Sequence, residues 1–348
     1  MVFSSSSSHR AMRAFLLPCA TALLLMACGG STPPPKDPDL VADPPLGGNE
    51  GINEGAAQTD FQRAVAYIDK EQYAAGKVHL ERALKASPDN AEAHAYMGLV
   101  LEKENDLAGA EASYLAALKL KPGLAAAAQN LAAIYLSTSP PRTDDAIKHL
   151  RAALEKVPGD VGMLRNLGYA LGLKGDVEGA SKAYDTAIAK GDTVEVRFEY
   201  AAMLAEAKQH EKAVPHLKKV LEGTKDDPAM LVTVGRMLGY GKAFGDCVAA
   251  FDRAIKLKAT DPEWFVRRGT CKHELGDEAG ALADYQESVK VKPDYAAGYY
   301  YMGLAQLALQ KPQSAEFSMG KAVELGKDAP IGKAAKDKLR EIKAINKR

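Results

Sequence analysis

The sequence is poor in residue types on which several protein classes depend. Its 348 residues include four cysteines and one tryptophan, and aromatic residues make up 7% of the chain. Cys19 and Cys28 lie near the N-terminus, so only Cys247 and Cys271 remain for a folded region. Two cysteines are too few for a disulfide-stapled framework. Because both lie among small residues of predicted helices, we expect two buried thiols there, with one bridge as the alternative.

The chain also lacks an excess of either charge. It carries 45 lysines and arginines against 45 aspartates and glutamates. A nucleic-acid-binding protein normally needs a strongly basic face. The balance therefore argues against a nucleic-acid partner.

Motifs that carry catalysis or bind metals are missing as well. The seven histidines are scattered, none with the spacing of a zinc site, and we expect them to lie at the surface. The stretch GYGKAF, residues 239–244, lacks the Gly-Lys-Ser/Thr order of a phosphate-binding loop. No nucleophile elbow or paired-cysteine motif occurs. We therefore predict no enzyme activity, cofactor, metal or small-molecule substrate; a direct activity would need a site that these residues do not form.

The apolar run near the N-terminus is too short to cross a bilayer. It extends over 13 uncharged residues, Phe15 to Ala27, whereas a spanning helix needs about 20. Arg10 and Arg13 precede it, and no acidic residue does. A basic start, a short apolar run and a small final residue are typical of an export signal. We predict that residues 1–27 form a signal peptide that is removed.

The residues at the end of this run resemble the lipobox of bacterial lipoproteins. They read Leu25-Met26-Ala27-Cys28. The resemblance implies cleavage before Cys28 and acylation of its sulfur, with fatty acids such as palmitate, so that the chain is anchored to a membrane. In that family an Asp after the cysteine retains the protein at the inner membrane, and Gly29 in its place implies the outer membrane, facing the periplasm. The alternative is an ordinary secretory peptide in which Cys28 is accidental.

Residues 28–56 are predicted to be a tether. From Gly29 to Ala56 the chain has six prolines, six glycines and almost no large apolar side chains. Such a segment cannot bury a core. An extended Pro-rich chain spans ~3 Å per residue, so this one could reach roughly 80–90 Å from the lipid.

From residue 57 to 329 the sequence repeats with a period near 34. In most units two small residues lie twelve positions apart, and a large residue lies four positions after the second of them. In the third unit the spacing is two residues wider, because STSPPRTDD lengthens the turn. Units begin near residues 57, 91, 125, 161, 194, 228, 262 and 296. The regular pairs are Ala64/Gly76, Gly98/Ala110, Gly168/Ala180, Ala201/Ala213, Gly235/Cys247, Gly269/Ala281 and Gly303/Ala315.

Each unit is predicted to be a helical hairpin. Apolar residues at three- and four-residue spacing mark one buried face of each helix, and small residues let two helices approach closely. A lone hairpin cannot bury its apolar face, so units stack and share a core. The pattern resembles the tetratricopeptide repeat, which implies an all-α, right-handed superhelical solenoid of about eight helix-turn-helix repeats. Residues 330–348 are predicted to form a capping helix. The last 28 residues, Lys321 to Arg348, are mainly basic, which suits a solvated cap, with an acidic partner as the alternative.

The resemblance also implies a binding surface. In tetratricopeptide proteins the first helix of each repeat lines a concave groove that holds a peptide. Amides can pair with a peptide backbone, arginine with a carboxylate, and aromatic rings supply contact area. The residues that fall on this groove are Phe61, Tyr96, Gln129, Asn130, Arg165, Asn166, Tyr169, Phe198, Arg236, Tyr240, Arg267, Tyr300 and Tyr301. The alternative is that these side chains are solvated or pack between units.

These expectations combine into one functional hypothesis. We predict a lipid-anchored periplasmic scaffold that binds an envelope protein or peptide segment in its groove. The build resembles lipoproteins that support assembly of a type IV pilus secretin, called pilotins, and lipoproteins of gliding-motility machinery. The alternative is a non-catalytic recruiter or regulator of enzymes that synthesise cell wall or glycan polymers.

Overall fold

The computed structural model describes residues 54–346. The predicted signal peptide, Cys28 and the tether as far as residue 53 lie outside the described residues. Within 54–346 the regular structure consists of seventeen α-helices and no strand. The prediction of an all-α fold is therefore confirmed.

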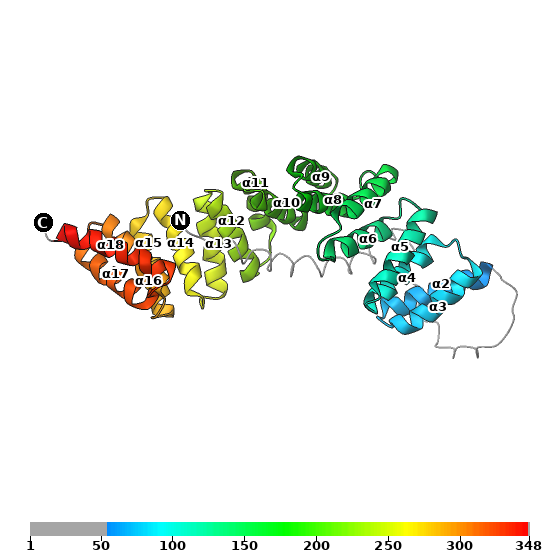
Figure 1. The fold of residues 1–348 in the computed structure, drawn as a ribbon, viewed down its shortest axis with the longest axis horizontal. Helices are drawn as coiled ribbons and strands as arrows, with labels where there is room; N and C mark the ends of the chain where they lie inside the picture. Colours follow the sequence, from blue (N-terminus) through cyan, green and yellow to red (C-terminus); the bar gives the residue numbers. More distant parts are fainter. Residues whose placement is uncertain (1–53, 347–348) are drawn as a thin grey trace. The chain divides into compact units, whose positions relative to one another are not determined.

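The helices fall into two units, residues 1–191 and 192–348, of which the structure describes 54–191 and 192–346. Figure 1 labels the helices along the chain. The N-terminal unit contains α2 (Glu54–Asp69), α3 (Tyr73–Ala86), α4 (Ala91–Lys103), α5 (Leu107–Leu120), α6 (Ala125–Ser137), α7 (Thr143–Lys156), α8 (Val161–Lys174) and α9 (Val177–Lys190). The C-terminal unit contains α10 (Val194–Glu206), α11 (His210–Gly223), α12 (Pro228–Tyr240), α13 (Phe244–Leu257), α14 (Pro262–Glu274), α15 (Glu278–Val291), α16 (Ala296–Ala308), α17 (Pro312–Gly326) and α18 (Pro330–Asn346).

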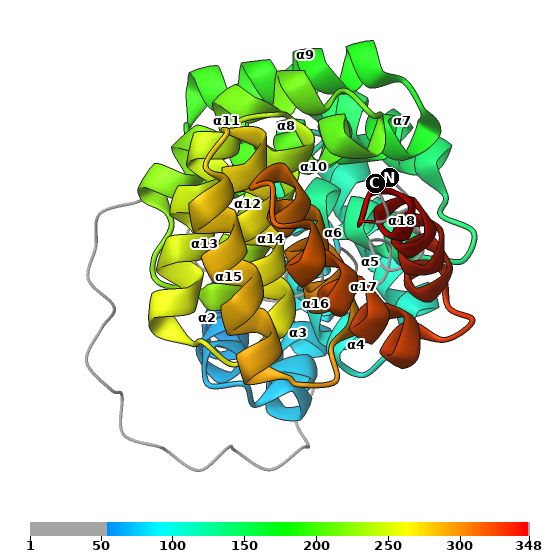
Figure 2. The ribbon, with the colours of Figure 1, turned by 90° about the vertical axis from the view of Figure 1, so that its left-hand side faces the viewer.

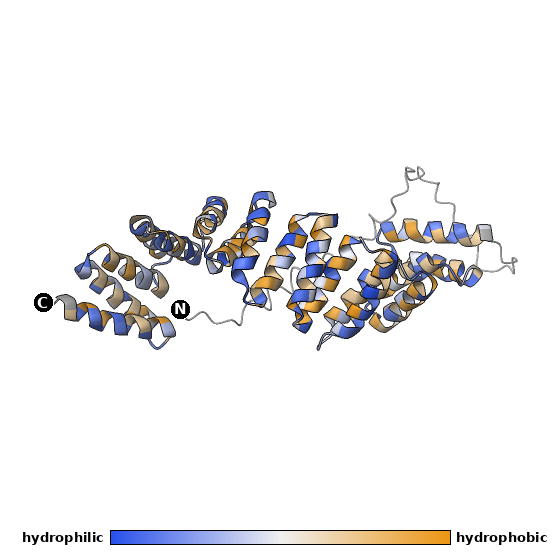
Figure 3. Ribbon diagram, turned by 90° about the horizontal axis from the view of Figure 1, so that it is seen from above, coloured by the Kyte–Doolittle hydropathy of each residue, from blue (hydrophilic) through white to orange (hydrophobic). Residues whose placement is uncertain are grey.

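Consecutive helices form hairpins, and the hairpins stack within each unit. In the N-terminal unit α2 pairs with α3, and α3 in turn packs on α4. In the C-terminal unit α12 to α15 lie side by side, and α18 packs on α17 (Figure 2). Apolar and polar residues alternate along the helices, as one-sided burial requires (Figure 3). The result is eight helix-turn-helix repeats followed by a C-terminal helix, as the 34-residue period predicts.

Close approach of the two helices explains the small residues of the repeat. A Cβ atom on Gly98 of α4 would lie 2.6 Å from the ring of Tyr114 on α5, which is fully buried. A Cβ atom on Gly269 of α14 would meet Tyr285 of α15 at 2.6 Å as well. The small residue of the first helix therefore faces the large residue of the second. This contact fixes the spacing between them.

The turn inside most repeats contains one residue in the left-handed conformation. It is a glycine at Gly175 (φ 85°) and Gly276 (φ 82°), and a larger residue at Glu71, Asn105, Lys208, Lys242 and Gln310. Such a conformation costs a non-glycine residue roughly 1–2 kcal/mol. Within the third repeat, described throughout its longer turn at 138–142, no residue has a positive φ.

Arg142 holds that longer turn in place. Its guanidinium donates to Glu111 on α5 (Nη1 to Oε2, 2.8 Å) and to Asp145 (Nε to Oδ2, 2.8 Å). It also lies over the ring of Tyr135, 4.2 Å from the ring centre. The Tyr135 hydroxyl donates to the same Glu111 at 3.0 Å. The inserted residues are thus tied to the preceding repeat.

Cys247 and Cys271 form a disulfide, so the expectation of two thiols is wrong. Cys247 lies on α13 and Cys271 on α14, with Cα atoms 6.3 Å apart and sulfur atoms 2.02 Å apart. Both are buried. A Cβ atom on Gly239 would lie 3.5 Å from each sulfur, which is ordinary van der Waals contact, so Gly239 lies directly beside the bridge. The pairing arises because the second helix of one repeat packs on the first helix of the next.

A buried ion-pair cluster lies in the same part of the C-terminal unit. Asp284 of α15 is only 3% exposed. It pairs with Arg268 (Nη2 to Oδ1, 2.5 Å) and Lys272 (Nζ to Oδ2, 3.0 Å), both on α14. Arg268 also reaches Asp252 on α13 at 2.7 Å. The cluster therefore links three consecutive helices.

Candidate functional site

In the N-terminal unit, the first helices carry an aromatic pair at one end of the predicted groove. Phe61 of α2 and Tyr96 of α4 are half-buried. Their ring centres lie 5.7 Å apart in an edge-to-face arrangement. This geometry is favourable for aromatic rings. The structure therefore brings together two predicted residues from adjacent repeats.

Asn130 lies in the interior instead of facing a groove. It is 4% exposed. Its amide Nδ2 donates to the hydroxyl of Tyr114 at 3.1 Å, and that hydroxyl donates to Glu102 at 3.2 Å. Burial raises the pKa of Glu102 above its ordinary value, and it raises the pKa of Tyr114 too. The prediction for Asn130 is an amide that faces a peptide in the groove, but in the structure this amide faces the interior. The hydroxyl of Tyr114 takes the place of a peptide group as its hydrogen-bond partner.

The equivalent Asn166 of α8 is half-buried and lies beside Gln129 of α6. Its Nδ2 approaches the Gln129 carbonyl at 3.4 Å. The Gln129 side chain donates to Asp160 at 3.0 Å, and Asp160 accepts from Met163 N at 2.7 Å as the N-cap of α8. Position in the repeat alone therefore does not decide whether an asparagine is interior or near the surface.

Arg165 and Tyr169 complete the polar surface of α8. Both are half-buried and are four residues apart, so they lie on the same side of the helix. Asn166 is adjacent to Arg165 on that helix. In the N-terminal unit the predicted residues thus provide a guanidinium, an amide and a phenol on α8, and an aromatic pair on α2 and α4.

In the C-terminal unit, tyrosines of α15, of α16 and of the turn before α16 form a cluster, and two of them lie near Arg267. The rings of Tyr300 and Tyr301 on α16 lie edge to face at 5.4 Å, and Tyr301 stacks on Tyr285 at 5.7 Å. Burial raises the pKa of Tyr301, and the neighbouring Tyr300 raises it further, while Arg267 opposes the shift. Burial also raises the pKa of Tyr295 to about 12.

Arg267 is held by Glu263, one turn earlier on α14. Its Nε donates to Glu263 Oε1 at 2.6 Å. Glu263 is partly exposed and Arg267 is mostly buried. A charged pair near the phenol rings of Tyr295 and Tyr301 can recognise a polar or charged segment. The arrangement offers neither a nucleophile with an adjacent base nor a set of metal ligands.

The remaining predicted residues of this unit are more dispersed. Phe198 is half-buried on α10, and Arg236 is exposed on α12. Tyr240, at the end of α12, is 43% exposed, and its ring lies 5.5 Å from that of His210 at the start of α11. The contacts therefore direct Tyr240 toward the turn of the preceding repeat.

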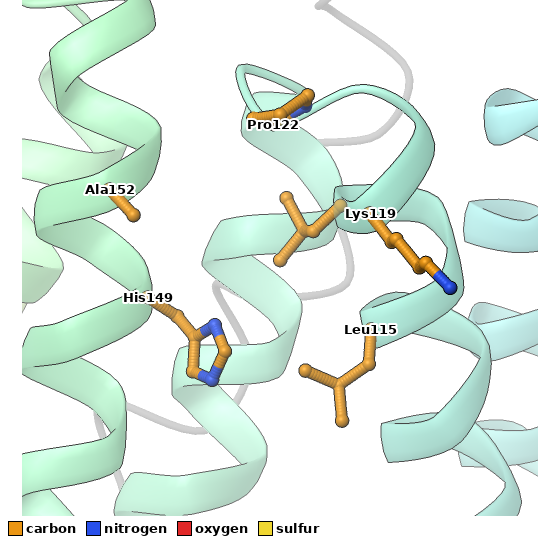
Figure 4. Close-up of a pocket in the computed structure, with 6 residues that line it drawn as sticks. Leu115, Lys119, Pro122, His149 and Ala152 are labelled. Atoms are coloured by element: carbon orange, nitrogen blue, oxygen red, sulfur yellow. The ribbon is translucent and has the colours of Figure 1, made fainter.

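A small pocket, unforeseen from the sequence, opens between second helices of the N-terminal unit. Its volume is about 290 Å³, and Leu115, Leu118 and Lys119 of α5 line it together with Pro122, His149 and Ala152 (Figure 4). Burial lowers the pKa of His149, and the nearby Lys148 lowers it further. The lining is mainly apolar. It could accept an apolar side chain, but its residues form no catalytic arrangement.

One histidine departs from the expected surface position. His79 of α3 is 2% exposed, and its Nδ1 lies 2.8 Å from Asp60 Oδ1. Its ring stacks on Tyr67 of α2 at 5.4 Å. The expectation of a surface histidine is wrong here, because Asp60 and Tyr67 provide an interior site for the ring. Across residues 54–346, no group of three or more His, Cys, Asp or Glu is placed to hold a metal ion.

The described helices show no membrane-spanning segment. None of those between residues 54 and 346 combines the length and the apolar character needed to cross a bilayer.

The helical hairpins are similar to tetratricopeptide repeats, and the fold is an all-α array of stacked helical hairpins. A family model described as tetratricopeptide repeat matches residues 61–132, 142–192 and 174–228. These segments fall within the array of helical hairpins, α2 to α12. The matched segments therefore agree with the repeat fold built from the helices.

Part of the chain is similar in sequence to a known protein. The BBSome complex member bbs-4 of Caenorhabditis elegans is 30% identical over 122 residues, which are 32% of this chain and 26% of that protein. The chain thus spans about a quarter of that relative.

Two solved structures extend the likeness. The C-terminal part of a TPR repeat-containing protein from Cytophaga hutchinsonii has a TM-score of 0.53 at 15% identity, covering 69% of this chain and 98% of that one. Pseudomonas aeruginosa pilF has a TM-score of 0.50 at 19% identity, covering 61% and 96%. At these identities the likeness shows the fold alone.

Proposed function

We propose that this protein is a lipid-anchored periplasmic scaffold whose tetratricopeptide repeats bind a segment of another envelope protein. The observation that carries the proposal is the surface of α8, where Arg165, Asn166 and Tyr169 are half-buried on consecutive turns. Partly buried guanidinium, amide and phenol groups suit peptide recognition, since their positions are already restricted before a partner binds. A stacked-repeat architecture also offers an extended surface for an extended ligand.

Two features support a location outside the cytoplasm. The residues Leu25 to Cys28 resemble a lipobox, and the basic and apolar segments before them suit export. The disulfide between Cys247 and Cys271 suits an oxidising compartment such as the periplasm. The disulfide belongs to the folded region and is therefore independent of the N-terminal pattern.

The role we propose for the scaffold is to support assembly of an envelope machine, such as a type IV pilus secretin or a gliding-motility apparatus. A non-catalytic scaffold fits the described residues, which provide contact surfaces but no catalytic arrangement. The alternative role is recruitment of enzymes for cell-wall or glycan-polymer synthesis. The identity of the captured partner distinguishes the two roles.

Crosslinking in intact cells, followed by affinity capture and mass spectrometry, tests the binding surface. The variant carries Arg165→Ala, Asn166→Ala and Tyr169→Ala on α8. The matched control carries Lys182→Ala, Asp185→Ala and Lys190→Ala, three exposed residues on α9 of the same repeat. We expect a dominant envelope partner to be lost with the α8 variant and retained with the control. An unchanged partner in both would contradict the proposed surface.

The anchor is tested separately. We expect Cys28→Ala to move the protein from the membrane fraction to the soluble periplasmic fraction, with the captured partner still able to bind in extracts. Unchanged membrane association would contradict a lipid attached to Cys28. This result would leave the α8 surface to be judged by its own experiment.

A further inference from the structure

We propose that the exposed face of the C-terminal helix α18 binds the headgroups of an anionic phospholipid membrane. This surface contains none of the residues predicted for the groove. The proposal goes beyond the proposed function, and it rests on the burial, spacing and ion pairs of residues 330–344.

The apolar face of α18 is already occupied by the solenoid. Ala335 and Ile342 are fully buried and cluster with Met319 and Ala322 of α17. Figure 2 shows α18 beside α17, in agreement with the contacts between them. This face is therefore not available to insert into a bilayer. A partner must meet the opposite, solvent-exposed face.

That opposite face carries a basic ridge, formed by Lys333, Lys336, Arg340 and Lys343. All four are exposed. Their steps of three, four and three residues place them within about 80° of one another around the helix axis, over a length of about 15 Å. The helix contains five basic and two acidic residues in all. Its exposed charge is therefore predominantly positive.

The acidic residues of α18 neutralise only part of the ridge. Asp337 pairs with Arg340 at 3.2 Å, and Glu341 pairs with Lys338 at 2.5 Å. Within the described part of the chain, Lys333, Lys336 and Lys343 form no ion pair. Three ammonium groups along one ridge are thus available for an external anion. Lys347 continues the same spacing in the sequence but lies outside the described residues.

The composition of the ridge favours a lipid surface over a protein partner. The residues that contribute most of the binding energy at protein interfaces are usually aromatic or large side chains that fill pockets. Between residues 331 and 344 of α18, where side-chain burial is described, the exposed apolar residues are only Ala334 and Ala344. An anionic membrane requires no such anchor, because each lysine or arginine near its surface strengthens binding by itself, by about fivefold.

Vesicle co-sedimentation tests the proposal. The full chain carries Cys28→Ser, which removes the lipid anchor, and is mixed with phosphatidylcholine vesicles with or without phosphatidylglycerol. The test variant adds Lys333→Gln, Lys336→Gln and Lys343→Gln. The control adds Lys148→Gln, Lys156→Gln and Lys182→Gln, which are exposed lysines of the N-terminal unit and change the net charge equally. Circular dichroism confirms that each variant is folded.

We expect the unsubstituted background and the control to prefer phosphatidylglycerol vesicles, and the test variant to lose at least about tenfold of that preference. Raising salt from about 0.1 M to about 0.5 M should weaken the preference, since it shortens electrostatic reach. Equal binding to both vesicle types, or equal losses in the test and control variants, would overturn the proposal. So would photo-crosslinking from position 336 in cells to a protein without lipid adducts. Loss of the groove partner in the α8 variant bears only on the proposed function.

Discussion

Neighbouring repeats are joined differently in the two units. In the N-terminal unit the links include hydrogen bonds from Asn130 to Tyr114 and from Gln129 to Asp160, and a partly exposed ion pair between Arg142 and Glu111. In the C-terminal unit the sixth and seventh repeats share a disulfide, and Arg268 bridges acidic residues from both. A repeat protein is stabilised largely by interfaces between adjacent repeats. The comparison therefore teaches that one repeat pattern can have interfaces of unequal strength, and the N-terminal ones should open more easily.

The largest expected effect comes from Asp284→Ala in the C-terminal unit. The substitution leaves Arg268 and Lys272 without their buried partner. Breaking a buried pair in this way costs about 3–5 kcal/mol. Hydrogen exchange of α14 and α15 measures this loss locally, which is preferable because repeat arrays need not unfold in one step.

The matched control is Asp252→Ala, which removes another partner of the same Arg268. The Asp252 side chain is 53% exposed. An exposed pair contributes about 0–1 kcal/mol, so little change is expected. Equal losses for the two variants would show that burial of Asp284 is not the source of its effect.

Removal of the disulfide should have the next largest effect. Cys247 and Cys271 are 24 positions apart. A bridge that closes a loop of this length stabilises the folded state by about 3 kcal/mol, so we expect a loss of that order in the Cys247→Ala, Cys271→Ala variant. Hydrogen exchange of α13 and α14 should accelerate, whereas α4 and α5 should not change. A reductant should destabilise only the unsubstituted protein; sensitivity of the variant to the reductant would contradict this account.

A pH dependence should distinguish the N-terminal unit. Burial raises the pKa of Glu102 above its ordinary value of 4.5. As pH rises, the unfolded chain releases this proton first, so the folded state binds more protons between the two pKa values. The free energy of unfolding should therefore fall through that window, by at most about 1.4 kcal/mol per pH unit. Hydrogen exchange of α4 and α5, measured as a function of pH, should show this slope in the unsubstituted protein and lose it in the Glu102→Gln variant. An unchanged slope in the variant would assign the pH dependence to another group.

The smallest effects concern the left-handed turn residues, which occur in both units. Gly175→Ala in the N-terminal unit should destabilise its repeat by about 1 kcal/mol, since a Cβ there meets no atom within 4 Å and only backbone strain is added. Gln310→Gly in the C-terminal unit should be neutral or stabilising by up to about 1 kcal/mol, because it relieves that strain. Exchange of the adjacent helices tests both. A stabilising effect of Gly175→Ala, or a clear destabilisation by Gln310→Gly, would contradict this account.

Much of the fold follows from the sequence, but less of the candidate site does. The spacing of Gly98 and Ala110 predicts a hairpin, because close helix packing needs small residues at fixed positions. The same reasoning treats Asn130 and Asn166 alike. Spacing along the chain cannot distinguish the two asparagines, because only Asn130 is contacted by Tyr114. That contact depends on the neighbouring repeat.

The sequence by itself determined the all-α class, the period near 34 and the small residues that face large ones. These are properties of local periodicity, which each repeat carries within its own residues. Only the tertiary structure decided that Cys247 joins Cys271, that Asp284 is buried between Arg268 and Lys272, and that His79 lies inside. Those outcomes depend on which side chain the adjacent helix presents at a distance of a few ångströms, and spacing along the chain does not specify it.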